Sequence, residues 1–143
     1  IAFSWKKGTG YYLPFPEDRT ACETKLAYFS PFFQSSEIEK VGHNLKYDIK
    51  VLQQYGMNVQ APLFDTMIAH YLINPDMRHN MDVLSENYLG YQPQPITELI
   101  GKKGPNQGSM RNVPLDKQTE YAVEDADVTY QLKNHFVAEM ASK

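Results

Sequence analysis

Asp48 occupies a position where a helix would be expected to carry an apolar side chain. At about 100° per residue, it falls within an arc of apolar residues made by Leu45, Val51, Leu52 and Tyr55. A carboxylate on an inward face must be neutralised, hydrogen-bonded or paired with a cation, because burying it bare is costly. The spacing therefore predicts a partner for this carboxylate.

Asp125 has the same kind of surroundings near the end of the chain, within a helical stripe of Tyr121, Val128, Leu132 and Phe136. Two inward carboxylates that face one core predict a shared divalent metal site. Carboxylates and water are the ligands that Mg²⁺ or Mn²⁺ prefers. A carboxylate in an apolar stripe can also bond a neighbouring backbone group or an arginine, so a purely structural role remains open.

Each of these aspartates has a polar residue one helical turn before it. Asn44 precedes Asp48 by four residues and Tyr121 precedes Asp125 by four, so each pair shares a helix face. A phenol one turn from a metal-binding carboxylate can orient a water molecule. Carboxylate pairs that hold two divalent ions typically catalyse phosphodiester hydrolysis.

Other polar residues are expected to have other roles. Asp65 is expected to cap a helix rather than to bind a metal. Glu120, Glu124 and Asp127 point away from the apolar stripe and are expected on a solvated face. The histidines show no zinc spacing and are interpreted as structural or surface residues: His43, His70, His79 and His135.

The composition indicates one domain, residues 1–143. With 42% hydrophobic residues the chain can bury a single core. A net charge of −3 excludes the general basic field of a duplex-wrapping protein, although a metal site could still hold phosphate locally. The single cysteine, Cys22, cannot form an internal disulfide, which fits a cytoplasmic location. No apolar run is long enough to span a membrane.

The periodicity of the chain alternates between strand and helix. Strands are predicted at 1–6 and 11–15, around a hairpin turn, and at 40–42 and 61–64. Helices are predicted at 20–33 (kinked or restarted at Pro31), 44–55, 66–73, 81–89 and 115–140. Residues 90–114 are predicted to form a long functional loop that contains one turn of helix. The pattern indicates an α/β domain with a mixed β-sheet flanked by helices.

Two segments resemble active-site motifs of a known superfamily. Residues 41–48 (VGHNLKYD) resemble the second motif of the DEDDy 3′–5′ proofreading exonucleases, and residues 121–129 (YAVEDADVT) resemble their third motif, Tyr-x-x-x-Asp. Residues 64–67, 79–82 and 101–107 are similar to segments of the exonuclease domain of bacterial DNA polymerase I, a family A polymerase. Five motifs in order over nearly the whole chain identify it as a member of this superfamily, whose fold is ribonuclease H-like.

The resemblance implies a 3′–5′ DNA exonuclease that uses two divalent metal ions, Mg²⁺ or Mn²⁺. Its substrate would be the 3′ end of single-stranded DNA, and its products nucleoside 5′-monophosphates. By the resemblance, Asp125 binds the first metal, Asp48 binds the second, and Tyr121 positions the attacking water. Asn44 and Tyr47 are candidates for contacts to the terminal nucleotides. A polymerase domain is expected C-terminal to this one, in a bacterial cytoplasmic protein.

The chain departs from the family pattern at the first motif, Asp-x-Glu, which does not occur anywhere in it. In the family this motif lies on the strand before the one that opens the chain. We therefore expect the domain to be N-terminally truncated, its first, central strand to be missing, and the fragment itself to be inactive. Two alternatives remain open. One is a ribonuclease D-like RNA exonuclease, which matches residues 101–107 less well, and the other is a non-catalytic scaffold domain of a polymerase.

Overall fold

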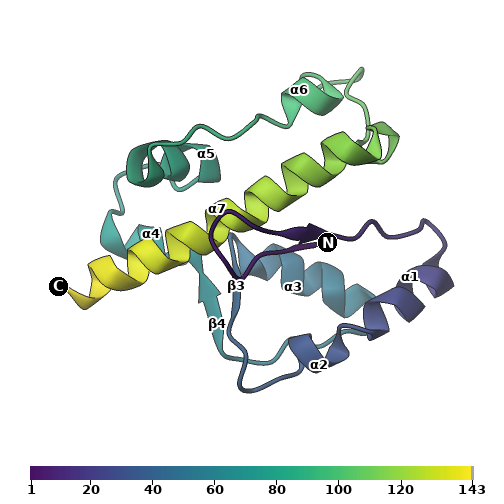
Figure 1. Ribbon diagram of the computed structural model, residues 1–143, viewed down its shortest axis with the longest axis horizontal. Coiled ribbons are helices and arrows are strands. Elements are labelled where there is room, and N and C mark those ends of the chain that lie inside the picture. The colour runs from purple at the N-terminus through teal and green to yellow at the C-terminus, as the bar shows by residue number, and fades with distance from the viewer. Residues whose placement is uncertain (143) are drawn as a thin grey trace.

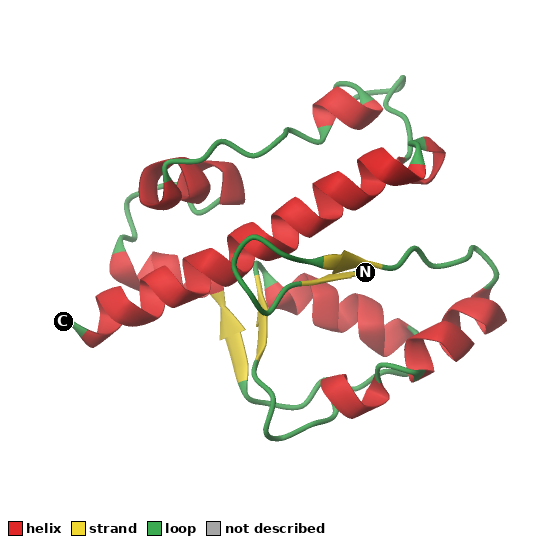
Figure 2. Ribbon diagram, in the orientation of Figure 1, coloured by secondary structure: helices red, strands yellow, loops and turns green. Residues whose placement is uncertain are grey.

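The computed structural model describes residues 1–142, and Lys143 of the predicted domain lies outside the described residues. Helices predominate over short strands (Figure 2). The elements in chain order are β1 (Ala2–Phe3), β2 (Tyr11–Tyr12), α1 (Arg19–Ala27), α2 (Ser30–Phe33), β3 (Lys40–Gly42), α3 (Leu45–Gln54), β4 (Leu63–Asp65), α4 (Thr66–Ile73), α5 (Met81–Leu84), the π-helical turn η1 (Ser85–Leu89), α6 (Thr97–Ile100), the 3₁₀ turn η2 (Met110–Asn112) and α7 (Leu115–Ala141).

The described strands form two separate two-stranded sheets rather than one mixed sheet. β1 and β2 form an antiparallel hairpin in which Phe3 pairs with Tyr11. β3 and β4 are parallel, with Val41 opposite Phe64. Parallel neighbours need a crossover connection, and α3 lies in the connection between these two strands. The α/β composition predicted from the sequence is therefore present, but its strands are divided between two small sheets.

The long helix α7 links the two sheets. It packs against the hairpin and against β3, and it also packs against α4 and η1 (Figure 1). Its apolar stripe builds the first core, whose buried members are Ala69, Leu84, Val128, Leu132 and Phe136. None of the described helices is long and apolar enough to cross a membrane.

A second core lies between the hairpin and the two helices that follow it, where Leu26, Phe33 and Met57 are buried. The ring of Phe3 stacks on Phe29, with centroids 5.1 Å apart, and meets Phe32 edge-on at 5.3 Å. Aromatic pairs in these geometries stabilise beyond the area that they bury. The hairpin is therefore fixed on one side by this aromatic packing and on the other by α7.

Most helix boundaries agree with the sequence predictions, but the strands predicted at 1–6 and 11–15 shorten to two residues each in β1 and β2. The predicted helix 20–33 is divided into α1 and α2, with Pro31 in the first turn of α2, where its missing N–H costs nothing. The predicted helix 81–89 continues from α5 into a π-helical turn, in which the Ser85 hydroxyl donates to the carbonyl oxygen of Tyr91 at 2.6 Å. The loop 90–114 contains two short helical turns, α6 and η2.

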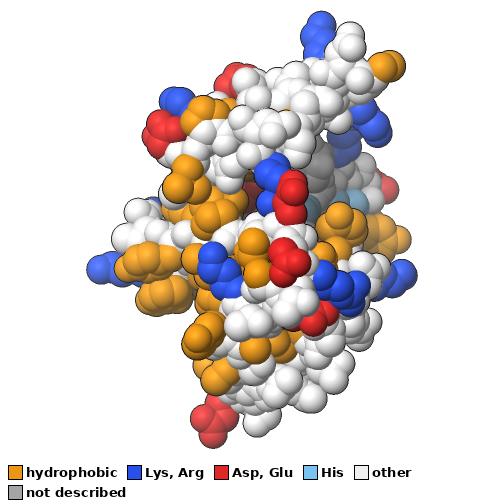
Figure 3. Space-filling view, turned by 90° about the vertical axis from the view of Figure 1, so that its right-hand side faces the viewer, with side chains coloured by type: hydrophobic (Ala, Val, Ile, Leu, Met, Phe, Trp, Pro, Cys, Tyr) orange, Lys and Arg blue, Asp and Glu red, His pale blue; other side chains and the backbone are white. Residues whose placement is uncertain are grey.

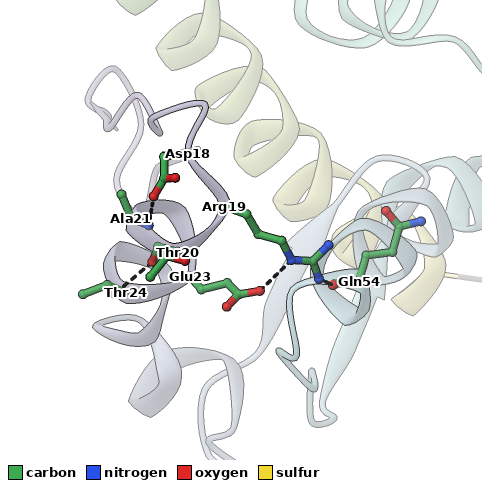
Figure 4. Close-up of polar contacts among 7 residues, drawn as sticks. All are labelled: Asp18, Arg19, Thr20, Ala21, Glu23, Thr24 and Gln54. Atoms are coloured by element: carbon green, nitrogen blue, oxygen red, sulfur yellow. Dashed lines mark hydrogen bonds and ion pairs between the residues drawn. The ribbon is translucent and has the colours of Figure 1, made fainter.

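Helix α1 holds the C-terminal end of α3 in place (Figure 4). The Asp18 carboxylate caps α1 by accepting from the Ala21 N–H at 2.8 Å. The Arg19 guanidinium then bridges the two helices, because it pairs with Glu23 at 2.8 Å and donates to the carbonyl oxygen of Gln54 at the end of α3. α3 is the helix that carries Asp48.

The Asp65 carboxylate holds the other end of α3. As predicted, it caps α4 by accepting from the N–H groups of Met67, at 2.9 Å, and Ile68, at 3.4 Å. It also accepts from the N–H groups of Asn44, at 3.0 Å, and Leu45, at 2.8 Å, which the sequence did not predict. Asn44 has a left-handed backbone with φ of 65°, so the start of α3 depends on a side chain from β4.

We expect Asp65→Ala to lower the free energy of unfolding by about 2–4 kcal/mol, because one substitution removes the caps of two helices and each cap typically contributes about 1–2 kcal/mol. The matched control is Asp18→Ala, which removes a single cap and should cost about 1 kcal/mol. Urea unfolding of both variants decides between these values. Equal losses in the two variants would show that the bonds from Asp65 to α3 contribute nothing.

Candidate active site

Asp48 lies one turn into α3 and is exposed, so the expectation that it occupies a buried face is wrong. None of the residues of α3 is fully buried, and Val51 is 38% exposed. The physical reason is that Leu52 and Tyr55, at the end of the stripe, pack on the second core, and Asp48 lies in the open part before them. Partial desolvation, with the charge of Asp65 nearby, still raises the pKa of the Asp48 carboxyl.

Gly42 allows the first turn of α3 to pack directly against the end of β3. A Cβ atom at this position would overlap with Cδ2 of Leu45, closer than real Cβ atoms come. It would also lie 3.8 Å from Oδ2 of Asp48. The Asp48 carboxylate is therefore at the carboxyl end of β3, and β3 is a strand against which α7 packs.

Tyr121 and Asp125 form a coupled pair on α7, as their spacing predicted. Burial raises the pKa of Asp125 to about 6, the charges of Glu124 and Asp82 add to this, and a hydrogen bond from Tyr121 opposes it. Burial and the charge of Asp125 raise the pKa of Tyr121 to about 12, so its hydroxyl keeps its proton at neutral pH. A carboxylate that is desolvated among other acids is destabilised as an anion, and a bound cation would relieve this.

Asp82 is a member of this cluster that sequence reasoning did not single out. It lies in the first turn of α5, and its charge raises the pKa of both Asp125 and Tyr121. The available signal was its place in the family-like segment 79–82, since helical periodicity cannot bring together residues of two different helices. The acidic surroundings of Asp125 therefore come from two elements.

The predicted site residues fall into two groups. Tyr121 and Asp125 lie together, and Asp48 lies near Asp65. Asn44 and Tyr47 are exposed at the start of α3, with Tyr47 67% exposed. Among residues 1–142, no group of three or more His, Cys, Asp or Glu side chains is arranged to hold a metal ion. A metal site shared by Asp48 and Asp125 remains a prediction.

Two residues expected on a solvated face have specific partners instead. The Glu124 carboxylate accepts from the Tyr91 hydroxyl at 2.5 Å and from the Gln94 N–H at 2.7 Å. The Asp127 carboxylate accepts from the Gly8 N–H at 2.9 Å. The long loop and the hairpin thus pack on the two flanks of α7, which the periodicity of α7 alone could not reveal. Glu120 remains largely exposed, as expected.

The histidines have structural roles, in agreement with the sequence prediction. His70 is fully buried, with its Nδ1 2.6 Å from Nδ1 of His79 and its Nε2 3.1 Å from the Tyr88 hydroxyl. Burial and the neighbouring His79 lower the pKa of His70, so it is neutral at physiological pH. His43 bonds the Thr66 hydroxyl at 2.9 Å. These contacts fix α4 and the segment that leads into α5.

We expect Asp125→Asn to raise the free energy of unfolding at pH 7.5 in the presence of EDTA. The pKa of Asp125 is about 6 in the folded state against 3.8 ordinarily, so its stabilising contribution is present below about pH 4 and is lost as the pH rises through 6. The difference between these two pKa values corresponds to a change in the free energy of unfolding of at most about 3 kcal/mol. Solvent screening reduces this change to about 1–2 kcal/mol.

Denaturant unfolding at pH 4.5 and pH 7.5 measures this effect, with the exposed loop residue Asp76 changed to Asn as the control. The gain in Asp125→Asn should be about a third as large at pH 4.5 as at pH 7.5. A gain of equal size at both pH values would contradict the raised pKa of Asp125.

We expect Glu124→Ala to lower the free energy of unfolding by about 1–2 kcal/mol, because the Tyr91 hydroxyl and the Gln94 N–H lose their acceptor. Glu120→Ala on the same helix should stay within about 0.5 kcal/mol of the unaltered protein. Limited proteolysis within residues 90–96 and thermal unfolding both measure the difference. Equal effects of the two variants would show that the loop is not held by Glu124.

Charge on the molecular surface agrees with the low net charge. On the face shown in Figure 3, basic and acidic side chains are interspersed among apolar ones, and neither sign forms a continuous field. Attraction of a polyanion to this face by a general basic field is therefore excluded. Recognition of phosphate would have to be local.

Comparison with known proteins agrees with the motifs. The family model described as 3′–5′ exonuclease matches residues 1–141. The chain is similar to DNA polymerase I of Borreliella burgdorferi (34% identity over 98% of this chain), of Pseudomonas aeruginosa (32% over 92%) and of Rhizobium leguminosarum (38% over 75%). It covers 15%, 15% and 10% of the lengths of these proteins, respectively. The chain therefore belongs to the 3′–5′ exonuclease family found in DNA polymerase I.

Proposed function

We propose that this chain is the proofreading 3′–5′ exonuclease domain of a DNA polymerase I and that it hydrolyses the terminal phosphodiester of single-stranded DNA. The observation that carries the proposal is the pair of Tyr121 and Asp125, a desolvated carboxylate bonded to a phenol. A buried structural aspartate would be expected to have a lowered pKa from its partners. A raised pKa is expected for a carboxylate whose cationic ligand is not bound.

The residues present fit divalent metal ions in type but are too few to hold them alone. Asp125 would hold the first ion and Asp48 the second, and carboxylate oxygens are the donors that Mg²⁺ or Mn²⁺ prefers. When bound, two such ions neutralise charge on the phosphate and lower the pKa of water. The remaining ligands would come from an Asp-x-Glu motif on a preceding strand, so the fragment by itself should be inactive.

The separation of the two sheets supports the presence of a further strand between them in the intact domain. β1 and β3 both pack on α7 but do not pair with each other. We propose that a preceding strand lies between them in the intact domain and joins the four described strands into one mixed sheet of the ribonuclease H-like type. Its acidic residues would then lie between α3, which carries Asp48, and α7, which carries Asp125.

Three residues would act directly on the substrate. The Tyr121 hydroxyl keeps its proton at neutral pH and would orient a water molecule for attack on the terminal phosphodiester. Asn44, whose backbone is held by Asp65, and Tyr47, which is 67% exposed, would contact the terminal nucleotides. A stacked aromatic ring is tolerant of base identity, which suits an enzyme that removes any nucleotide.

The relatives favour DNA as the substrate over RNA. The names of these relatives are DNA polymerase I, and the chain covers 15% or less of the three compared above. We therefore propose that a polymerase domain follows in the parent protein and that the protein acts in the bacterial cytoplasm. A ribonuclease D-like activity and a non-catalytic scaffold remain outcomes of the test below.

The test compares the chain as it stands with a chain extended by its natural preceding residues. With Mn²⁺ and a 5′-labelled single strand, the short chain should bind metal weakly and hydrolyse negligibly, whereas the extended chain should release nucleoside 5′-monophosphates from the 3′ end. In the extended chain, Asp125→Ala should lower kcat by more than about 1,000-fold. Tyr121→Phe should lower it by about 100-fold and spare metal binding. Glu120→Ala is the control that should leave kcat unchanged.

Several outcomes would overturn parts of this proposal. Robust hydrolysis by the short chain would refute the ligand assignment. An inactive extended chain that carries Asp-x-Glu would indicate a scaffold, and preference for RNA over DNA would indicate the ribonuclease D-like alternative.

A further inference from the structure

The turn of the β1–β2 hairpin exposes two aromatic rings that no core explains. Trp5 is 67% exposed and Tyr11 is 61% exposed. Their rings stack on each other, with centroids 5.0 Å apart and planes inclined by 18°. Aromatic side chains of this size are normally buried on most of their surface. A preformed, exposed stack is therefore a feature that points to a ligand with flat rings.

The same turn is basic. Lys6 and Lys7 are exposed beside the rings, and residues 1–16 contain no Asp or Glu. The acid that the turn does contact is Asp127 of α7, whose carboxylate accepts from the Gly8 N–H. Aromatic rings next to free lysines are the combination with which proteins bind single-stranded nucleic acid, because the rings stack on bases and the lysines neutralise phosphates.

The turn is held in a fixed shape by its own bonds. The Thr9 N–H and hydroxyl both donate to the carbonyl oxygen of Lys6, at 3.1 and 2.9 Å. The Ser4 hydroxyl donates to the carbonyl oxygen of Thr9 at 2.6 Å. A binding surface that is already ordered loses less conformational entropy when a ligand arrives. The hairpin thus presents its rings without a folding step.

The turn rests on α7, the helix that carries Tyr121 and Asp125. A Cβ atom at Gly10 would come within 2.7 Å of Cγ1 of Val123, so the hairpin rests directly on α7. With the bond from Gly8 to Asp127, the hairpin contacts α7 on both sides of Asp125 in sequence. Figure 1 shows the hairpin lying across the middle of α7. Val123 and Asp127 lie about 160° around α7 from Asp125. A strand whose 3′ end reached Asp125 would therefore cross a flank of α7, a helix about 10–12 Å wide, before its preceding nucleotides reached this turn.

We propose that Trp5 and Tyr11, with Lys6 and Lys7, form a second contact for single-stranded DNA, which holds nucleotides upstream of the one being removed. We call this surface the hairpin platform. The choice of DNA as its ligand rests on the proposed function, but binding to the platform needs no metal ion. It predicts that a long single strand binds more tightly than a di- or trinucleotide, since a short strand occupies the active site without reaching the platform.

Because Trp5 is the one tryptophan of the chain, its fluorescence reports binding directly. In EDTA, a 12-nucleotide oligothymidylate should quench it in a saturable manner. Affinities of variants are measured by the anisotropy of the same oligonucleotide carrying a 5′ dye. Trp5→Ala and Tyr11→Ala should each weaken binding by about 5- to 100-fold. Trp5→Phe, which keeps an aromatic ring, should retain most of the affinity of the unaltered chain. Lys6→Gln combined with Lys7→Gln should make the slope of log affinity against log salt concentration shallower by about 2, which corresponds to the loss of two phosphate contacts.

The matched control is Tyr28→Ala, because Tyr28 is 81% exposed at the end of α1 and lies outside the platform. It should bind like the unaltered chain. Circular dichroism shows whether each variant is folded. If Trp5→Ala does not fold, Tyr11→Ala and Trp5→Phe still test the platform.

Three binding results would overturn the platform. These are equal affinity in Trp5→Ala, Tyr11→Ala and Tyr28→Ala, equal affinity for blunt duplex and single strand, or no binding of the 12-nucleotide strand by the unaltered chain. A dimer in sedimentation that Trp5→Ala abolishes would assign the rings to a protein interface and refute the proposal. Failure of the proposed function is separate, because it is scored by hydrolysis in the extended chain and not by binding in EDTA.

Discussion

The Asp65 carboxylate is the interaction on which the placement of Asp48 depends. Its two oxygens accept hydrogen bonds from four backbone N–H groups at the starts of α3 and α4. N–H groups at helix starts have no partner within the helix, so a single anion satisfies unpaired donors of both helices. It also joins the end of β4 to the turn after β3, and these are the two strands of the parallel sheet. Partial desolvation and then the charge of the same anion raise the pKa of Asp48, so the residue that holds the start of α3 also disfavours the ionised form of Asp48.

Helix α7 has the complementary task of collecting separate parts of the chain around Asp125. The apolar half of the helix builds the first core with α4 and α5. Its polar flanks receive the hairpin through Asp127 and the long loop through Glu124. Asp125 itself is partly buried, and burial is the main cause of its raised pKa. The ionised form of Asp125 therefore lowers the stability of the fold, which is the trade-off expected if Asp125 serves in the proposed metal site.

Local patterns in the sequence were sufficient to predict the helices and strands and part of the candidate site. Strands, helices, the cap at Asp65 and the pair of Tyr121 and Asp125 all follow from spacing along one segment. Contacts between distant segments could not be predicted in this way. The exposure of Asp48, the acidic neighbour Asp82 and the loop contacts of Glu124 depend on which surfaces pack together. Such packing is a property of the whole chain, and a helical wheel gives the direction of a side chain but not what lies there.

The contacts of residues 123–127 have a consequence for how this domain can change in length. Val123 touches the hairpin, Glu124 holds the long loop, and Asp127 binds the hairpin turn. Each residue of a helix is rotated by about 100° from the next, so inserting or deleting one residue before this segment would turn all of these side chains away from their partners at once. The exposed stretch 101–108 carries few such attachments. Natural variation in length should therefore be found in that loop and be excluded from the first half of α7.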